Sequence, residues 1–413
     1  MASICLITPS PLSTNPRLVK EADALHAAGH KVTVITTTVK GWARTADREF
    51  ESRAWHSRTV LQFGPGTTAR LRLVQIVRQR TARLMLRASL KHPKIVGAAW
   101  HPVEPDLVRA ASAIKADLYI AHYPAALRAA ALAAAKHGGR YAVDAEDFHL
   151  GDPPPAVAYD NLRASTRAIE SRYLDGCAYV SAASPGIADA YVEAYGIVRP
   201  TVVLNVFPLA NAPSHLTSRG VAAPGPSVYW FSQTIGADRG LECAVAAIGI
   251  ARAKPHLYVR GNPSPGFIAK LQSIAATWGA ENRLHILPPG APAEMERLAA
   301  AYDLGLVAET GLTPNRRIAL TNKLFSYALA GVPALISDIP AHRTYAEMAG
   351  AAVRLYAVGD SANLACTMDQ LLDGDSTVLA AAREHAFNLG QHSLNWDNES
   401  KKLLHQVDLA LAG

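Results

Sequence analysis

The stretch of sequence that most constrains the fold is residues 303–338, which read DLGLVAETGLTPNRRIALTNKLFSYALAGVPALISD. It begins with an apolar run at 303–308, continues through a polar, basic loop, and then has a helix-length segment at 323–330. Gly331 ends that segment, and Pro333 begins a second apolar run. Strand, loop, helix and strand in this order predict a βαβ unit. Ligands bind outside the carboxyl ends of such strands and helix N-termini attract phosphate, so the stretch predicts a site for a phosphate-bearing ligand.

The length of the chain indicates two domains of this kind. Its 413 residues exceed what one hydrophobic core usually organises and fit two domains of about 200 residues each. Apolar runs alternate with helix-period segments over residues 1–206 and again over 227–385. Residues 207–226 are proline-rich with little periodicity, which indicates a linker, and residues 386–413 have a helical pattern. We therefore predict the α/β class with two Rossmann-like domains.

The amino-acid composition indicates which class of protein this is and in which compartment we expect it. Hydrophobic residues make up 49% and charged residues 18%, which is typical of a globular protein. No apolar run reaches the roughly 20 residues of a membrane-spanning helix, and the N-terminus MASICLITPS has no basic region of a signal peptide. The four cysteines are far apart without metal-site spacing, so we expect buried thiols in a reducing cytoplasm.

A formal net charge of +7 favours binding to an anionic partner. The alternative is a basic soluble protein without such a partner. Residues 70–94 contain no acid, and Leu73, Ile76, Val77 and Leu84 lie near one helical face. This pattern predicts a basic amphipathic helix that contacts an anionic membrane, with a solvated basic face as the alternative. Nucleic acid is not expected because no aromatic residues interleave with the basic ones. Those basic residues are Arg70, Arg72, Arg78, Arg80, Arg83, Arg87, Lys91 and Lys94.

The first turn of the chain, PSPLSTNPR after the strand at 3–8, lacks the GxGxxG pattern. Without those glycines the backbone cannot approach a pyrophosphate closely, so a nicotinamide cofactor is not expected. Thr14 and Asn15 in this turn either face a substrate or cap the helix that follows.

An acidic loop follows the strand at 140–143, with the sequence DAEDFHLGD. Clustered carboxylates raise one another's pKa, and a carboxylate can orient an imidazole. We therefore predict catalytic residues among Glu146, Asp147 and His149, with a solvated acidic loop as the alternative.

Taken together, these segments resemble retaining glycosyltransferases of the GT-B fold, in glycosyltransferase family 4 (glycosyl transferases group 1). The resemblance implies two Rossmann-like domains facing each other across a cleft, and a C-terminal helix that crosses back to the first domain. The motifs that carry it are TNPRLVKE at 14–21, AGHKVTV at 28–34, DAEDFH at 144–149, VLN at 203–205, RGLE at 239–242, NKLF at 322–325 and AGVP at 330–333.

The resemblance also implies roles for individual residues. Arg239 neutralises the donor diphosphate, and Asn322 and Lys323 bind the donor at a helix start. The loop at 232–236, with Gln233 and Thr234, lines the phosphates through backbone N–H groups. The remaining implied contacts are those of Leu287 and Pro288 with the nucleotide base, and of Thr14, Asn15 and Arg17 with the acceptor.

The sequence departs from the family at two glutamates that are eight positions apart. These positions hold Ile318 and Ser326 here. Ser326 can still hydrogen-bond a ribose hydroxyl, though as a weaker acceptor than a carboxylate, and Glu309 could take over the sugar contact.

The resemblance and the charges together predict a glycosyltransferase that needs neither metal nor cofactor. Its substrates would be a nucleotide-diphosphate-sugar and a saccharide or lipid-linked hydroxyl acceptor, with retention, in bacterial-type glycan, polysaccharide or glycolipid synthesis. Cationic side chains would stabilise the departing diphosphate. The alternatives are a sugar-nucleotide-binding protein without turnover and a GT-B epimerase.

Overall fold

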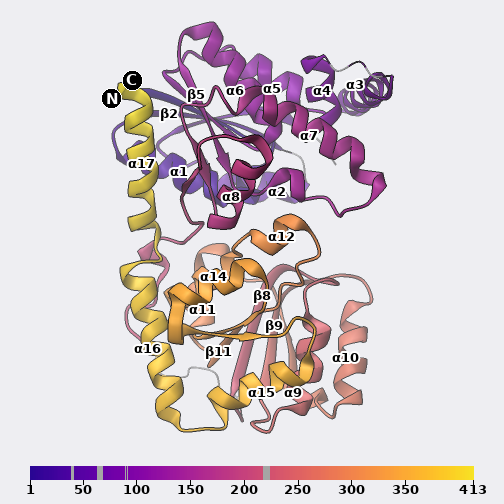
Figure 1. Cartoon of the computed structure of the whole chain (residues 1–413), viewed down its shortest axis with the longest axis vertical. Coiled ribbons are helices and arrows are strands. Elements are labelled where there is room, and N and C mark those ends of the chain that lie inside the picture. Colours follow the sequence, from indigo (N-terminus) through magenta and orange to yellow (C-terminus); the bar gives the residue numbers. More distant parts are fainter. Residues whose placement is uncertain (39–40, 63–67, 89, 91, 217–223) are drawn as a thin grey trace. The chain divides into compact units, whose positions relative to one another are not determined.

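The computed structural model describes residues 1–38, 41–62, 68–88, 90, 92–216 and 224–413. The chain divides into two compact units: an N-terminal unit of Met1–Val203 with Ser400–Gly413, and a C-terminal unit of Leu204–Glu399. Each unit is a parallel sheet covered by helices, so the predicted α/β class is confirmed (Figure 1).

The sheet of the N-terminal unit has the strand order β3-β2-β1-β4-β5-β6-β7. The sequence did not predict β3, whose residues HSRTVLQ are mostly polar, although its backbone pairs with β2. The strands are β1 (Ser3–Ile7), β2 (Lys31–Thr38), β3 (His56–Gln62), β4 (Leu118–His122), β5 (Arg140–Ala145), β6 (Val180–Ala182) and β7 (Thr201–Val202).

The helices of this unit cover both faces of its sheet. Because parallel crossovers are right-handed and the strand order reverses at β1, helices α1 and α6 lie on opposite faces. The alanine-rich α6 packs closely on β1, β4 and β5. The helices are α1 (Pro16–Ala27), α2 (Gly41–Ala46), α3 (Ala69–Arg87), α4 (Pro93–Trp100), α5 (Glu104–Ala111), α6 (Pro124–His137), α7 (Asp160–Tyr173) and α8 (Pro185–Tyr195), with short 3-10 turns that include η1 (Leu12–Thr14) and η3 (His149–Gly151).

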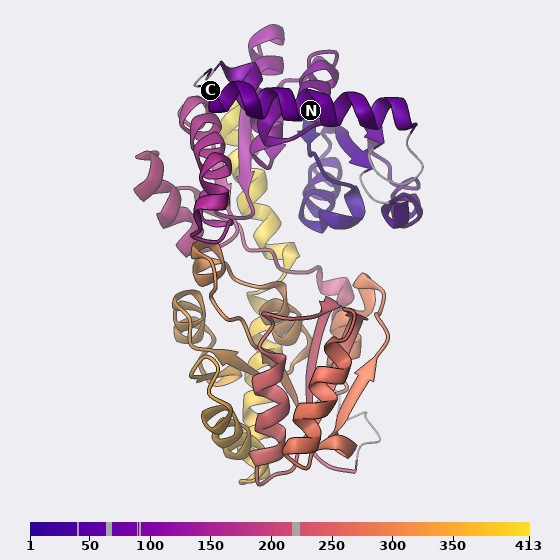
Figure 2. The ribbon, with the colours of Figure 1, turned by 90° about the vertical axis from the view of Figure 1, so that its right-hand side faces the viewer.

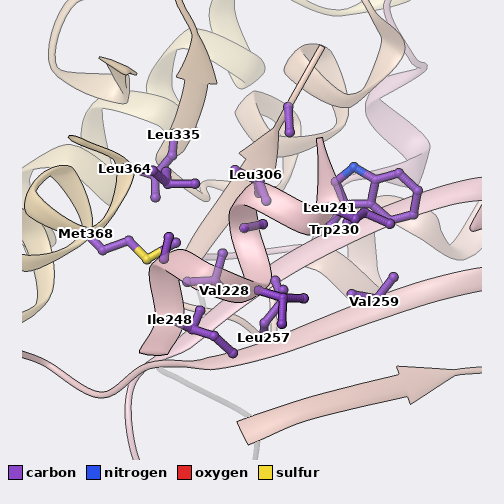
Figure 3. Close-up of a cluster of buried hydrophobic side chains, with 14 of the residues drawn as sticks. Val228, Trp230, Leu241, Ile248, Leu257, Val259, Leu306, Leu335, Leu364 and Met368 are labelled. Carbon is purple, nitrogen blue, oxygen red and sulfur yellow. The ribbon is translucent and has the colours of Figure 1, made fainter. Parts of the chain in front are cut away.

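The sheet of the C-terminal unit has the order β10-β9-β8-β11-β12-β13. Its core gathers apolar side chains such as Trp230, Leu241 and Leu306 from the central strands and the adjoining helix (Figure 3). The strands are β8 (Ser227–Ile235), β9 (His256–Pro263), β10 (Leu284–Leu287), β11 (Leu304–Val307), β12 (Ala334–Ser337) and β13 (Val353–Tyr356). The helices are α9 (Leu241–Ile250), α10 (Phe267–Thr277), α11 (Met295–Ala299), α12 (Pro314–Ile318), α13 (Asn322–Ala330), α14 (Pro340–Ala349), α15 (Ser361–Leu372) and α16 (Ser376–His392).

The βαβ unit predicted at residues 303–338 is confirmed as β11, α13 and β12. Gly331 ends α13 in the left-handed conformation, with φ of 68°. The predicted polar loop is only partly a loop, because Pro314–Ile318 form the short helix α12. The side chain of Thr313 caps α12 by accepting a hydrogen bond from the Arg316 N–H at 3.2 Å.

The C-terminal residues form two helices where the sequence predicted one continuous pattern. Helix α16 ends at His392, and α17 (Trp396–Ala412) begins anew. Buried Asn395 explains the break, because its Oδ1 accepts a hydrogen bond from the Asn398 N–H at 3.1 Å and so caps the second helix. Residues from Ser400 onward belong to the N-terminal unit. Within the described residues, no helix is both long enough and apolar enough to cross a membrane.

Candidate functional site

Both sheets reverse their strand order at one point, between β1 and β4 in the N-terminal unit and between β8 and β11 in the C-terminal unit. Ligands of open α/β sheets bind at the carboxyl ends of the strands beside such a switch point. The segments that follow β1, β8 and β11 hold Thr14, Asn15, Arg239 and Glu309, whereas the predicted catalytic loop follows β5, the neighbour of β4.

In the C-terminal unit, Lys323 and Glu309 form a buried ion pair with Nζ and Oε1 3.1 Å apart. Lys323 lies in the first turn of α13, and its ammonium is 5.8 Å from the centre of the Trp230 ring. Burial acts to raise the pKa of Glu309, but the positive charge of Lys323, and then of Arg239, outweighs burial and holds this pKa below its usual value. Glu309 is therefore a carboxylate at neutral pH, paired with Lys323 and close enough to Arg239 to feel its charge.

The turn between β8 and α9 lies against the loop that follows β11. Gly240 has φ of 68°, and a Cβ atom at this position would lie 2.5 Å from the carbonyl oxygen of Ala308. Only glycine permits this close approach, which brings the neighbouring Arg239 to the charged pair of Lys323 and Glu309. Asn322, the exposed first residue of α13, lies at the same helix start.

Two other segments that were predicted to bind the donor have a different local structure from the one expected. Gln233 and Thr234 belong to β8, which continues past a register shift to pair Thr234 with Asn262 of β9, so this segment is not a free loop. Leu287 is the last residue of β10, and the Pro288 carbonyl accepts a hydrogen bond from Arg260 at 2.7 Å.

Ser326 is fully buried, and its hydroxyl donates a hydrogen bond to Glu296 Oε1 at 2.7 Å. The sequence gave no signal for Glu296, because it lies 30 positions away on α11 and meets α13 only through the fold. A carboxylate thus lies next to the position where the family has its second glutamate. Ile318, at the other such position, ends α12.

In the N-terminal unit, Arg17 and Asn15 have internal partners rather than exposed side chains, which corrects their predicted placement toward an acceptor. Arg17 is fully buried and binds both carboxylate oxygens of Asp144, at 2.6 and 2.7 Å. Asn15 caps α1 by accepting a hydrogen bond from the Leu18 N–H at 3.1 Å, so the structure selects the capping alternative. The Thr14 hydroxyl donates to the Pro11 carbonyl at 2.9 Å.

Buried Glu21, His122 and Asp144 offer possible metal ligands that lie within 4.8 Å of one another. Because the Arg17 guanidinium already donates to both Asp144 oxygens, its charge opposes a second cation there. Burial acts to lower the pKa of His122, but the carboxylates of Glu21 and Asp144 outweigh burial and raise it. These residues fit an internal ion-pair network better than a metal site, and metal independence stays a prediction.

The predicted catalytic loop follows β5. Glu146 and Asp147 are half-buried, and the surrounding protein, followed by the Asp147 carboxylate, raises the pKa of Glu146 to about 7. His149 lies buried in η3, and burial lowers its pKa. Tyr123, which precedes α6 with a positive φ of 71°, packs its ring edge-on against His149, with ring centroids 5.4 Å apart.

A hydrogen-bonded chain that the sequence did not reveal fixes the His149 imidazole. The Tyr191 hydroxyl lies 3.4 Å from His149 Nδ1 and donates to Glu170 Oε1 at 2.8 Å, so we assign the proton of His149 to Nδ1. Nε2 is then the basic atom, and it is buried without a hydrogen-bond partner among the described residues. Burial raises the pKa of Glu170 to about 7, although Tyr195 and Tyr191 donate hydrogen bonds to it.

Comparison with known proteins finds a family match in the N-terminal half of the chain. Residues 14–207 match the family described as the glycosyl transferase 4-like domain. The predicted resemblance to family 4 is thereby confirmed, whereas no curated protein sequence matches the chain.

Solved structures extend the likeness from this domain to both units. Anabaena HepE, solved with UDP and glucose, shares 16% identity at a TM-score of 0.69, covering 99% of this chain and 100% of its own. Sucrose-phosphate synthase from Thermosynechococcus elongatus shares 14% identity at a TM-score of 0.70, with all of both chains covered. A glycosyltransferase from Rickettsia africae shares 13% identity at a TM-score of 0.67, covering 100% of this chain and 99% of its own. The predicted GT-B fold is confirmed.

Proposed function

We propose that the chain is a glycosyltransferase that moves a sugar from a UDP-sugar to a hydroxyl acceptor. The observation that carries this proposal is the arrangement of Arg239 and Lys323 around Glu309 at the switch point of the C-terminal unit. HepE, which has the same fold, was solved with UDP and with UDP-glucose, which supports UDP as the nucleotide.

The charges of this site suit the departure of a diphosphate. Breaking the anomeric C–O bond leaves extra negative charge on the phosphate oxygens, where Lys323, Arg239 and the N-terminus of α13 provide positive charge. Glu309, held ionised, can accept hydrogen bonds from sugar hydroxyls. Since the cationic side chains can neutralise the diphosphate, we propose a reaction without metal. We propose retention from the resemblance to the retaining enzymes of family 4.

The N-terminal unit would supply the acceptor side. A carboxyl group with a pKa near the working pH exchanges protons readily, which suits Glu146. His149 Nε2, which has no hydrogen-bond partner in the part of the chain that the structure describes, can accept a hydrogen bond from a substrate hydroxyl. We propose a saccharide or lipid-linked acceptor handled in the cytoplasm, in glycan, polysaccharide or glycolipid synthesis.

A second candidate is a sugar-nucleotide-binding protein without turnover. The contact that favours it is between Ser326 and Glu296, because both groups are buried and hydrogen-bonded to each other. A ribose would have to compete with this bond.

The deciding experiment measures release of UDP from UDP-sugars with a panel of saccharide and lipid-linked acceptors. We expect acceptor-dependent release that Lys323→Met abolishes and Lys270→Met leaves intact, because Lys270 pairs with Glu242 on the exposed surface. UDP binding without release under any acceptor would favour the binding protein. No binding of any nucleotide would overturn both functions.

A further inference from the structure

The outward face of α3 carries exposed apolar side chains, with the exposed Arg80 among them. Leu73, Val77 and Leu84 are spaced so that they share one side of this helix, and their exposed fractions are 61%, 52% and 62%. Val74, which is 52% exposed, extends the same surface. Figure 2 shows α3, in dark violet, as a long helix across the front of the N-terminal unit, with no other element of that unit in front of it.

The inward face of α3 is polar where a soluble protein would normally bury apolar residues. Gln75 is buried, and Gln79 donates a hydrogen bond to the Ala99 carbonyl at 3.3 Å. Arg78 donates to the Pro102 carbonyl and to Asp106. Ala82 and Leu86 add a small apolar contact with α4. The helix is thus attached mainly through polar groups and presents its apolar residues to the outside, the reverse of the usual amphipathic arrangement.

The surface around this apolar face is positively charged. Five exposed arginines lie on the same helix, and residues 70–94 contain no acid that could neutralise them. Lys91, which belongs to the same basic stretch of sequence, lies outside the described residues. A second copy of the same face would bring arginines against arginines, so charge complementarity favours an anionic partner. The exposed arginines are Arg70, Arg72, Arg80, Arg83 and Arg87.

We propose that α3 docks the protein on an anionic lipid bilayer. Leu73, Val77 and Leu84 enter the boundary between headgroups and acyl chains, while the arginines extend their charged ends to lipid phosphates. This inference deepens the proposed function by placing the acceptor side at a membrane. Membrane docking depends on α3 alone, so an experiment can refute it without refuting the proposed donor site.

The test is co-flotation of the purified full chain with phosphatidylglycerol–phosphatidylcholine vesicles and with phosphatidylcholine vesicles. We expect flotation with the anionic vesicles, weakened by salt. Replacing Leu73, Val77 and Leu84 by Ser should weaken vesicle binding about tenfold or more. Replacing Arg70, Arg72 and Arg87 by Gln should weaken it on the order of 100-fold. A control that replaces exposed Lys31, Lys115 and Lys254 by Gln removes the same charge elsewhere and should bind normally.

Three outcomes would overturn the proposal. Absence of flotation with anionic vesicles excludes a bilayer, and equal loss in the lysine control shows a general charge effect. Self-association that the serine variant abolishes, without vesicle binding, would assign the face to a second copy. All variants should bind UDP like the wild type, which separates loss of docking from unfolding and from failure of the donor site.

Discussion

Replacing Glu170 by Gln should change how stability depends on pH. Burial raises the pKa of Glu170 to about 7 from an ordinary value of 4.5, so the native state holds this proton over a pH range in which the unfolded state has lost it. The stability that this group contributes is present below pH 4.5 and is lost as pH rises through 7. The two pKa values differ by about 2.5, and at about 1.4 kcal/mol for each pH unit this amounts to about 3.5 kcal/mol.

The assay is urea unfolding of both proteins at several pH values from 4.5 to 8. The unfolding free energy of Glu170→Gln, minus that of the wild type, should rise by about 3 kcal/mol between pH 4.5 and pH 8. This rise is expected whatever the difference in stability between the two proteins is at low pH. Glu193→Gln, at an exposed position on α8, is the matched control and should show no such trend. A difference between Glu170→Gln and wild type that stays constant with pH would refute the raised pKa.

Three further substitutions test other contacts. Arg17→Ala should cost about 3–5 kcal/mol of unfolding free energy, because Asp144 would keep a buried charge without its partner; a loss below 1 kcal/mol would contradict the buried pair. Gly240→Ala should lower both the melting temperature and UDP affinity, since its Cβ meets backbone at positive φ, and unchanged affinity would place the turn outside the donor site. Ser326→Ala should cost about 1–3 kcal/mol because it removes a donor from buried Glu296, and denaturation curves that coincide with wild type would show that the contact does not form.

The sequence predicted the elements whose signals are local. Residues 303–338 combine apolar runs, a helix-length segment and Gly331 within a short stretch. The observed bounds of β11, α13 and β12 lie close to those that this pattern predicted. The break before α17 was not predicted, because it depends on how one buried side chain, Asn395, hydrogen-bonds.

Contacts between distant segments could not be predicted. Arg17 looked like a loop residue available to a substrate, and only the fold brings Asp144 to it across 127 positions. The acidic loop was recognised as a candidate site from its composition, but Tyr191 and Glu170, which orient His149, lie on helices with ordinary patterns. The pairing of Ser326 with Glu296 was likewise not predicted, because only the fold brings these two distant residues together.

The central claim is that the C-terminal unit binds a nucleoside diphosphate through Arg239 and Lys323. Calorimetric titration of UDP into wild type, Arg239→Ala and Lys323→Met tests it most directly. We predict saturable binding to the wild type and affinity at least about tenfold lower in each variant, since each loses a charged contact to phosphate. Absence of binding to the wild type, or equal affinity in all three proteins, would contradict the account.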